Sequence, residues 1–196
     1  MSKENQTAIA IVDVQRDFFR DVDMAQDKDR LIEKINELTQ MARLSNTPVI
    51  WVQQVFKEDL SDAYLGMRRN GVRTTVEGNP GSELLPELVV NDSDNHIIKK
   101  RYSAFFNTEL KELLESKGVK KLIVGGVKTH NCVRMTAVDA YQNDYDVILA
   151  TDCLANVGDE HDELTIKFLS KHIAVAMTNN EIMPLISSNK VSGINE

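Results

Sequence analysis

Short, nearly continuous apolar runs recur along the chain and alternate with longer segments in which apolar residues return every three or four positions. The short runs have the length and composition of strands buried on both faces. They lie at residues 8–14, 48–53, 96–100, 121–127, 146–153 and 174–178. The longer segments have the pattern of amphipathic helices and lie at residues 29–46, 108–118, 131–144 and 161–173. This alternation predicts a three-layer α/β/α sandwich around a mostly parallel, Rossmann-like sheet of about six strands.

Helix-terminus residues support the segment at 108–118. Thr108 is a plausible N-cap, and Gly118 is a plausible residue to end the helix in a left-handed conformation. Residues 55–94 follow neither period and are rich in glycine and proline, so we read them as a loop-rich insertion, which is more often functional than idle. No repeat or linker divides the chain, and we expect one domain over residues 1–196.

Charge and composition exclude several classes of protein. A formal net charge of −7 disfavours a nucleic-acid partner, which needs a basic face. No apolar run approaches the roughly 20 residues that span a bilayer, and residues 1–10 lack the features of a signal peptide. With only two cysteines the chain is not a disulfide scaffold. A cytoplasmic protein with no nucleic-acid or membrane partner is the expectation.

Polar side chains follow several of the predicted strands. In an open α/β sheet, ligands bind beyond the carboxyl ends of the strands. The residues at those positions are Asp13, Gln15 and Asp17 after the first strand, Gln53 and Gln54 near the second, Lys99 or Lys100 after the third, Thr129 and Cys132 after the fourth, and Asp152 and Cys153 after the fifth. An acid, a lysine and a thiol from three strand ends can therefore meet in one crevice.

Cys132 stands at or just inside the start of the helix predicted at 131–144. Helix N-termini favour a thiolate, and a nearby lysine would lower the thiol pKa further. A carboxylate would raise that pKa but could remove the proton as a general base when substrate binds. A cysteine at a helix start is by itself more often structural, but the combination with Asp13 and Lys99 favours catalysis.

The histidines and glycines give weaker signals. His130 is close to Cys132 in sequence, but no Asp or Asn stands out as its orienting partner, so a solvated or structural role is favoured. The other three histidines lack metal-ligand spacing, so no zinc site is predicted. The glycine pair of residues 125–126 does not match GxGxxG, which weakens a dinucleotide interpretation, and no cofactor is predicted.

Four stretches together resemble one family. They are IVDVQRDFF, KKRYSAFFNTEL, VGGVKTHNCVRMTAVDAY and EGNPGSELLPEL. In the order in which they occur along the chain, they look like the isochorismatase-like cysteine hydrolase superfamily, which includes nicotinamidases, carbamoylsarcosine amidohydrolases and isochorismatases. The resemblance covers roughly residues 6–186. It identifies the superfamily and not a substrate.

The resemblance implies a catalytic triad of Asp13, Lys99 and Cys132. Lys99 is preferred to Lys100 because the family's lysine stands three residues before the tyrosine, here Tyr102. The family also has a cis, non-proline peptide, which maps to Val127–Lys128. Backbone N–H groups of Lys128 and Cys132 would then form an oxyanion hole.

The resemblance also narrows the chemistry. Metal-dependent nicotinamidases carry an Asp-x-His pair after the second strand, whereas this chain has Gln54 there and no histidine in 55–95, so no metal is expected. Isochorismatases resemble the chain near Gln54 but typically lack the cysteine. We therefore expect a metal-independent hydrolase that cleaves a C–N bond of a small amide, ureido or carbamoyl compound. The alternatives are a vinyl ether hydrolase that uses Asp13 as an acid, and a non-catalytic binding protein.

Further expectations concern the pocket and the assembly. Five residues are candidates for contact with a small-molecule substrate, namely Phe18, Phe19, Trp51, Gln54 and Tyr102. Arg68, Arg69 and Arg73 could clamp an anionic group of that substrate, although a solvated loop is the more common reason for such a cluster. Family members are commonly homo-oligomers, so a homo-oligomer is expected. A redox-sensing thiol pair of Cys132 and Cys153 is a third, weaker hypothesis.

Overall fold

The computed structural model describes residues 6–20, 27–155 and 160–187. Six strands form one sheet in the order β3-β2-β1-β4-β5-β6, and every described pair is parallel. The strands are β1 (Thr7–Val12), β2 (Val49–Gln54), β3 (Asn95–Lys99), β4 (Lys121–Gly126), β5 (Asp146–Leu154) and β6 (Ala174–Met177). All six predicted strands and the α/β fold class are therefore confirmed.

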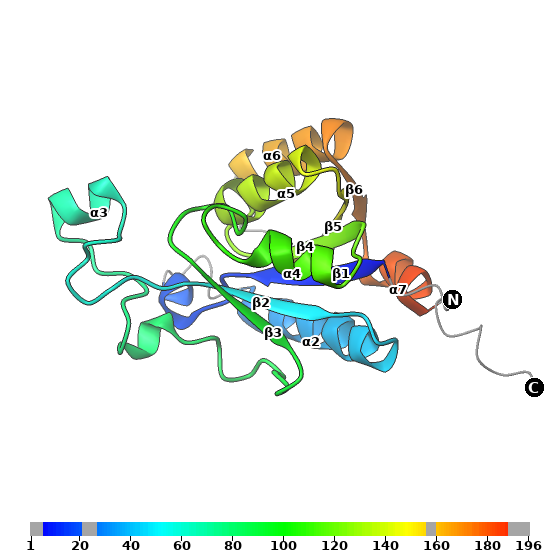
Figure 1. Ribbon diagram of the computed structural model, residues 1–196, viewed down its shortest axis with the longest axis horizontal. Helices are drawn as coiled ribbons and strands as arrows, with labels where there is room; N and C mark the ends of the chain where they lie inside the picture. Colours follow the sequence, from blue (N-terminus) through cyan, green and yellow to red (C-terminus); the bar gives the residue numbers. More distant parts are fainter. Residues whose placement is uncertain (1–5, 21–26, 156–159, 188–196) are drawn as a thin grey trace, which may run out of the picture.

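Helices cover both faces of the sheet (Figure 1). On one face lie α2 (Lys28–Leu44) and α7 (Asn179–Ser187); on the other lie α4 (Leu110–Ser116), α5 (Arg134–Gln142) and α6 (Glu160–His172). Alternate residues of a strand point to opposite faces. Ile9 and Ile11 of β1 accordingly pack in the apolar cluster beneath α2, whereas Ala8 and Ala10 pack in the cluster of the opposite face. Burial on both sides explains why the strands read as continuous apolar runs.

The observed ends of α4 agree in part with the N-cap and C-terminal residues predicted from the sequence. Gly118 has a φ of 65° and follows the last turn of α4 as predicted. Thr108 lies one residue before the N-cap of α4, Glu109, but its hydroxyl still accepts a hydrogen bond from the N–H of Leu110 at 3.3 Å. Helix α7 was not predicted, because Pro184 interrupts its apolar pattern and proline is normally excluded from helix interiors.

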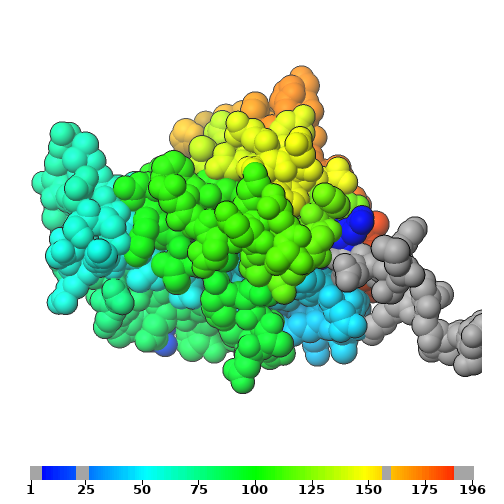
Figure 2. Space-filling model, in the orientation of Figure 1, coloured from blue at the N-terminus to red at the C-terminus, as the bar shows by residue number. Residues whose placement is uncertain are grey.

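The insertion at residues 55–94 packs around a small apolar cluster of its own. Phe56, Leu60, Ala63 and Val76 are its buried members. The insertion contains the 3-10 turn η2 (Pro80–Ser82) and the short helix α3 (Leu65–Asn70). Helix α3 projects from the body of the molecule (Figures 1 and 2), and none of its residues is buried.

One buried side chain attaches this insertion to the sheet. Gln15 Nε2 donates to the carbonyls of Gln54 and Ser82 at 2.9 and 2.7 Å, and Gln15 Oε1 accepts from the Gln54 N–H at 2.9 Å. Gln15 is fully buried, so all three bonds are made out of water. The polar residue after β1 thus has a structural role.

None of the helices in the described part of the chain has the length and apolar character needed to cross a bilayer.

Candidate active site

The carboxyl ends of β1, β3 and β4 converge at one edge of the sheet. Asp13 follows β1 directly, Lys99 is the last residue of β3, and Cys132 lies in the single π-helical turn η3 (Thr129–Val133) that follows β4 and runs into α5. Successive strands are added to one side of β1 as far as β3 and to its other side from β4 to β6, so the direction of strand addition switches between β1 and β4. Ligands of open α/β sheets bind at such switch points.

Glycines allow the strand ends to approach each other closely. Gly126 has a φ of 116°, and a Cβ atom there would lie 2.1 Å from the carbonyl oxygen of Val12. No other residue can combine this backbone conformation with this contact. A Cβ on Gly125 would lie 2.9 Å from the Cβ of Cys153. Gly126 therefore serves the approach of β4 to β1 next to Asp13, and Gly125 serves the approach of β4 to Cys153 of β5.

Lys99 connects the acid and the thiol. Its Nζ lies 2.8 Å from Oδ2 of Asp13 and 3.4 Å from Sγ of Cys132, and it also donates to the carbonyl of Arg101 at 3.0 Å. Asp13 and Lys99 have no exposed surface, and Cys132 is 5% exposed. The three residues that the resemblance implied as a triad are thus in contact.

Lys100 lies in a different environment from its neighbour. Its Nζ is 2.9 Å from Oδ2 of Asp62 and donates to the carbonyl of Val55. It therefore fastens the insertion to the end of β3. Of the two lysines, only Lys99 contacts Asp13 and Cys132.

Burial sets the protonation of the site. Burial raises the pKa of Asp13, and the positive charge of Lys99 opposes this rise only in part. Burial also works against the charge of Lys99, but the adjacent carboxylate and sulfur outweigh it, so the pKa of Lys99 is raised. The pKa of the Cys132 thiol is raised well above its usual range by burial first and by the charge of Asp13 second.

The raised thiol pKa decides between two expectations for Cys132. A helix start and a nearby lysine were expected to favour a standing thiolate. The structure instead favours a protonated thiol next to an Asp13–Lys99 ion pair, because burial outweighs the attraction of the lysine. Nucleophilic chemistry at Cys132 then requires a base.

The expected cis peptide is present between Val127 and Lys128. Lys128 is the N-cap of η3, and its carbonyl accepts hydrogen bonds from the N–H groups of Asn131 at 3.1 Å and Val133 at 3.3 Å. A π-helical turn is rare and is frequently found at functional sites. It places Cys132 at the entrance to α5.

An aromatic wall borders the triad. The hydroxyl of Tyr64 donates to Oε1 of Gln54 at 3.0 Å, and the rings of Tyr64 and Tyr102 lie 5.0 Å apart. The guanidinium of Arg101 lies over the Tyr64 ring at 5.4 Å. Gln54 is the register partner of Lys99 in the sheet, which places this wall beside the triad. Burial raises the pKa of Tyr64.

Gln54 and Tyr102, both expected as substrate contacts, are thus brought together, and Tyr64 joins them although sequence reasoning missed it. The residue lies in the irregular insertion, where neither periodicity nor the family stretches point to it. Its position immediately before α3 is a consequence of the insertion's own packing, since its ring also contacts Phe56 edge-on at 5.5 Å.

The remaining three expected pocket residues are Trp51, Phe19 and Phe18. Trp51 is completely buried in the apolar cluster beneath α2, and its Nε1 donates to Asp94 at 2.8 Å. Phe19 belongs to the same cluster, and Phe18 packs against it. The expectation of a pocket wall is corrected for Trp51 and Phe19, which are buried in the core, whereas Phe18 is only partly buried and its place in the pocket stays a prediction. In Trp51 the cause is strand alternation, which turns its side chain to the α2 face.

The arginines of the insertion also lie apart from the triad. Arg68 and Arg69 are exposed residues of the projecting helix α3, and Arg73 donates to the carbonyl of Glu58 at 2.9 Å. No hydrogen bond or ion pair within the described ranges joins any of the three to Asp13, Lys99 or Cys132.

The two cysteines lie on opposite faces of the sheet. Cys132 belongs to the apolar cluster beneath α5, and Cys153 belongs to the cluster beneath α2. Both are free thiols, and the sulfur of Cys153 donates to Oδ1 of Asn179 at 3.4 Å. Burial raises the pKa of Cys153 to about 12. The hypothesis of a redox pair is therefore contradicted by the fold.

His130, in contrast, does have an orienting carboxylate. Asp162 in the first turn of α6 lies 2.6 Å from Nδ1 of His130. The sequence did not reveal this partner because 32 residues separate the two.

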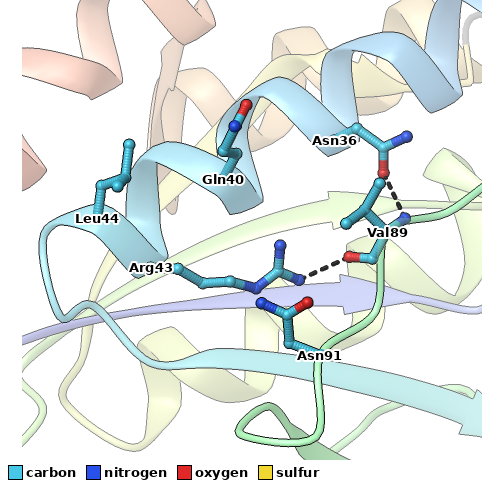
Figure 3. A pocket seen from close by; sticks show the side chains of 6 residues that line it. All are labelled: Asn36, Gln40, Arg43, Leu44, Val89 and Asn91. Atoms are coloured by element: carbon cyan, nitrogen blue, oxygen red, sulfur yellow. Dashed lines mark hydrogen bonds between the residues drawn. The ribbon is translucent and has the colours of Figure 1, made fainter.

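A surface pocket of about 390 Å³ lies away from this edge, between α2 and residues 89–91 (Figure 3). Arg43 and Asn36 of α2 reach the backbone of Val89 there. None of the triad residues lines it. Within the described ranges, no group of three or more His, Cys, Asp or Glu side chains is arranged to hold a metal ion.

Comparison with known proteins assigns the family. The Isochorismatase domain family matches residues 7–181. A probable inactive nicotinamidase of Arabidopsis thaliana is 35% identical over 157 residues, which cover 76% of this chain and 80% of that protein. A probable isochorismatase of Pseudomonas chlororaphis is 29% identical over 93% of this chain and 87% of that protein. The crystal structure of a cysteine hydrolase from Pseudomonas syringae pv. phaseolicola 1448A superposes with a TM-score of 0.86 at 23% identity and covers 95% of both chains. The chain belongs to the isochorismatase family and is a hydrolase of that family.

Proposed function

We propose that this hydrolase cleaves a C–N bond of a small amide, ureido or carbamoyl compound through a thioester on Cys132, without a metal. The observation that carries the proposal is the position of the Lys99 ammonium, which contacts both the Asp13 carboxylate and the Cys132 sulfur in a buried site. A thiol, a base and a fixed positive charge are the elements of nucleophilic catalysis.

In the first half-reaction, Asp13 removes the proton of Cys132 as the sulfur attacks the carbonyl carbon. The thiol needs this base because burial raises its pKa. Burial also raises the pKa of Asp13, which makes the carboxylate a better proton acceptor and then a proton donor to the departing amine. Lys99 stabilises the negative charge while it moves from the carboxylate to the sulfur.

In the second half-reaction, Asp13 activates a water molecule that hydrolyses the thioester and releases the acid and the free thiol. The N–H groups of Lys128 and Cys132 are proposed to bind the oxyanion in both halves. Gln54 and Tyr102 are the proposed substrate contacts, and Tyr64 orients Gln54 through the 3.0 Å hydrogen bond.

A second candidate is the cleavage of a vinyl ether, as in isochorismate, with Asp13 as the acid. The specific observation in its favour is the raised pKa of Asp13, because a buried carboxyl that keeps its proton can donate it. In that reaction the thiol of Cys132 has no role. A non-catalytic binding protein is a weaker candidate, because Asp13, Lys99 and Cys132 are all kept in contact.

An assay of ammonia release separates the candidates. Small primary amides, ureides and carbamates are incubated with the protein, and isochorismate cleavage is followed in parallel. The proposal predicts ammonia from at least one compound. Cleavage of isochorismate without ammonia from any compound would favour the acid mechanism, and absence of both activities would favour a binding protein.

A further inference from the structure

A second buried carboxylate reaches the segment that carries Cys132. Oδ1 of Asp162 lies 2.6 Å from Nδ1 of His130 and 3.1 Å from the backbone nitrogen of the same residue. Asp162 belongs to α6 and is 1% exposed, whereas His130 lies in η3, two residues before the nucleophile. One oxygen atom therefore holds both the backbone and the side chain of His130.

The backbone N–H of His130 donates to the carboxylate. An ionised carboxylate can only accept, so with Asp162 ionised the hydrogen of the imidazole contact is carried by Nδ1 of His130. Burying a carboxylate is costly unless donors replace its lost water. The position of Asp162 in the first turn of α6 is favourable because the N-terminus of a helix stabilises negative charge.

The segment held by Asp162 has a wide, uncommon turn. The N–H of Val133 donates to the carbonyl of Lys128, five residues earlier, which is the hydrogen bond of a π-helical turn, and the N–H of Asn131 donates to the same carbonyl. Thr129 Oγ1 donates to the carbonyl of Ala155 at 3.1 Å. The segment that precedes Cys132 is thus fixed at two successive residues, from the end of β5 and from α6.

We propose that Asp162 is a positioning residue that acts through His130 to hold the Cys132 sulfur against Lys99. The 3.4 Å contact between Sγ and Nζ depends on where η3 lies, because Lys99 belongs to a different strand. A displacement of about 1 Å at a reacting atom can reduce a rate by about a hundredfold. His130 falls within one of the four family stretches, but Asp162 lies outside all of them, and neither residue belongs to the triad.

The reactivity of the thiol tests the proposal without a substrate. Iodoacetamide labelling of Cys132 is measured as a function of pH for the whole protein, with the labelled site mapped by mass spectrometry. The groups that face the sulfur, namely Asp13 and Lys99, are left intact in every variant. A failure of this test leaves the proposed hydrolysis unaffected, and a failure to find a substrate leaves this test valid.

Asp162→Ala removes both hydrogen bonds and is expected to release η3, so that the sulfur becomes more exposed. Since burial is the first cause of the raised thiol pKa, the labelling profile should move to lower pH, by about half a unit or more, in a protein with native circular dichroism. Asp162→Asn keeps an oxygen acceptor at the same place and should restore most of the wild-type profile. Glu163→Gln removes a charge from the same helical turn at an exposed position and should leave the profile unchanged.

His130→Ala provides the second variant if Asp162→Ala does not fold. It removes the imidazole bond and keeps the backbone bond, so a smaller shift in the same direction is expected. The proposal is overturned if folded Asp162→Ala labels with the wild-type pH profile, if Glu163→Gln shifts the profile as much, or, where Asp162→Ala cannot be folded, if His130→Ala leaves the profile unmoved.

Discussion

The Nζ atom of Lys99 lies 2.8 Å from Oδ2 of Asp13, and neither side chain has any exposed surface. A buried ion pair gains little net stability, because desolvation offsets most of the attraction, but removal of one partner leaves an uncompensated charge. The pair is therefore better explained by its contact with Cys132 than by a contribution to stability.

Separate substitution of the adjacent residues Lys99 and Lys100 tests which of the two takes part in catalysis. Lys99→Met should lower kcat/KM by about a thousandfold or more, because it removes the positive charge that balances Asp13 and Cys132. Such a loss corresponds to about 4 kcal/mol of transition-state stabilisation. Lys100→Met is the matched control and should change kcat/KM by less than about fivefold. Equal losses in the two variants would contradict the assignment.

Asp13→Asn should separate the reactivity of the thiol from turnover. The carboxylate raises the thiol pKa, and Lys99 lowers it, so removal of the negative charge should lower the pKa of Cys132. Iodoacetamide should then label the variant at lower pH than the wild type, whereas amide hydrolysis should be lost because no base remains. Turnover at the wild-type rate would remove Asp13 from the role of base.

The arginines of the insertion are expected to have little effect on catalysis. Helix α3 projects from the body, and Arg73 is engaged with the backbone of Glu58. Arg68→Ala, Arg69→Ala and Arg73→Ala should each change kcat/KM by less than about twofold. A clamp on an anionic substrate would instead appear as a loss of about ten- to a hundredfold in at least one variant. Comparison of acidic with neutral substrates provides an independent check.

Asp94 is expected to stabilise the fold in a pH-dependent way. Burial works against its charge, but hydrogen bonds from Arg43, Asn91 and Trp51 outweigh it and lower the pKa of Asp94. The unfolded chain therefore binds the proton more readily, so the stabilisation is present above the unfolded pKa of about 4 and is lost as the pH falls below it.

Asp94→Ala should lower the free energy of unfolding by about 2–3 kcal/mol at pH 7, because it leaves the buried Trp51 N–H and the half-buried Arg43 guanidinium without this acceptor. Urea unfolding at pH 7 and at pH 3 should show the difference between variant and wild type shrinking at the lower pH. If the unfolding free energies of variant and wild type differ by the same amount at both pH values, the stabilisation does not come from the ionised form of Asp94. Asp92→Ala, an exposed neighbour, is the control.

The fold could be predicted from the sequence because burial on both faces leaves continuous apolar runs, as in β1 and β4. The strand-end rule and the family stretches pointed to Asp13, Lys99 and Cys132, which the structure brings together. What could not be predicted depends on contacts between segments far apart in sequence. Trp51 was misplaced because alternation alone does not tell which face of a two-sided sheet holds the pocket.

Tyr64 and Asp162 illustrate the same limit. Tyr64 reaches the site from an insertion without periodicity, through a hydrogen bond to Gln54. Asp162 reaches His130 across the contact between α6 and η3. Neither residue has a local pattern that distinguishes it from an ordinary polar residue of a loop or a helix.

The turnover of Cys132→Ala tests the central claim most directly. The side chain is small and packs at the start of α5, so the variant should fold, at a cost of about 1 kcal/mol for the lost contacts. Ammonia release from the best substrate of the screen is measured for wild type and variant under identical conditions, with circular dichroism as the control for folding. A thioester mechanism predicts a loss of at least about a thousandfold. A folded Cys132→Ala protein that retains activity within about tenfold of the wild type would contradict covalent catalysis at Cys132.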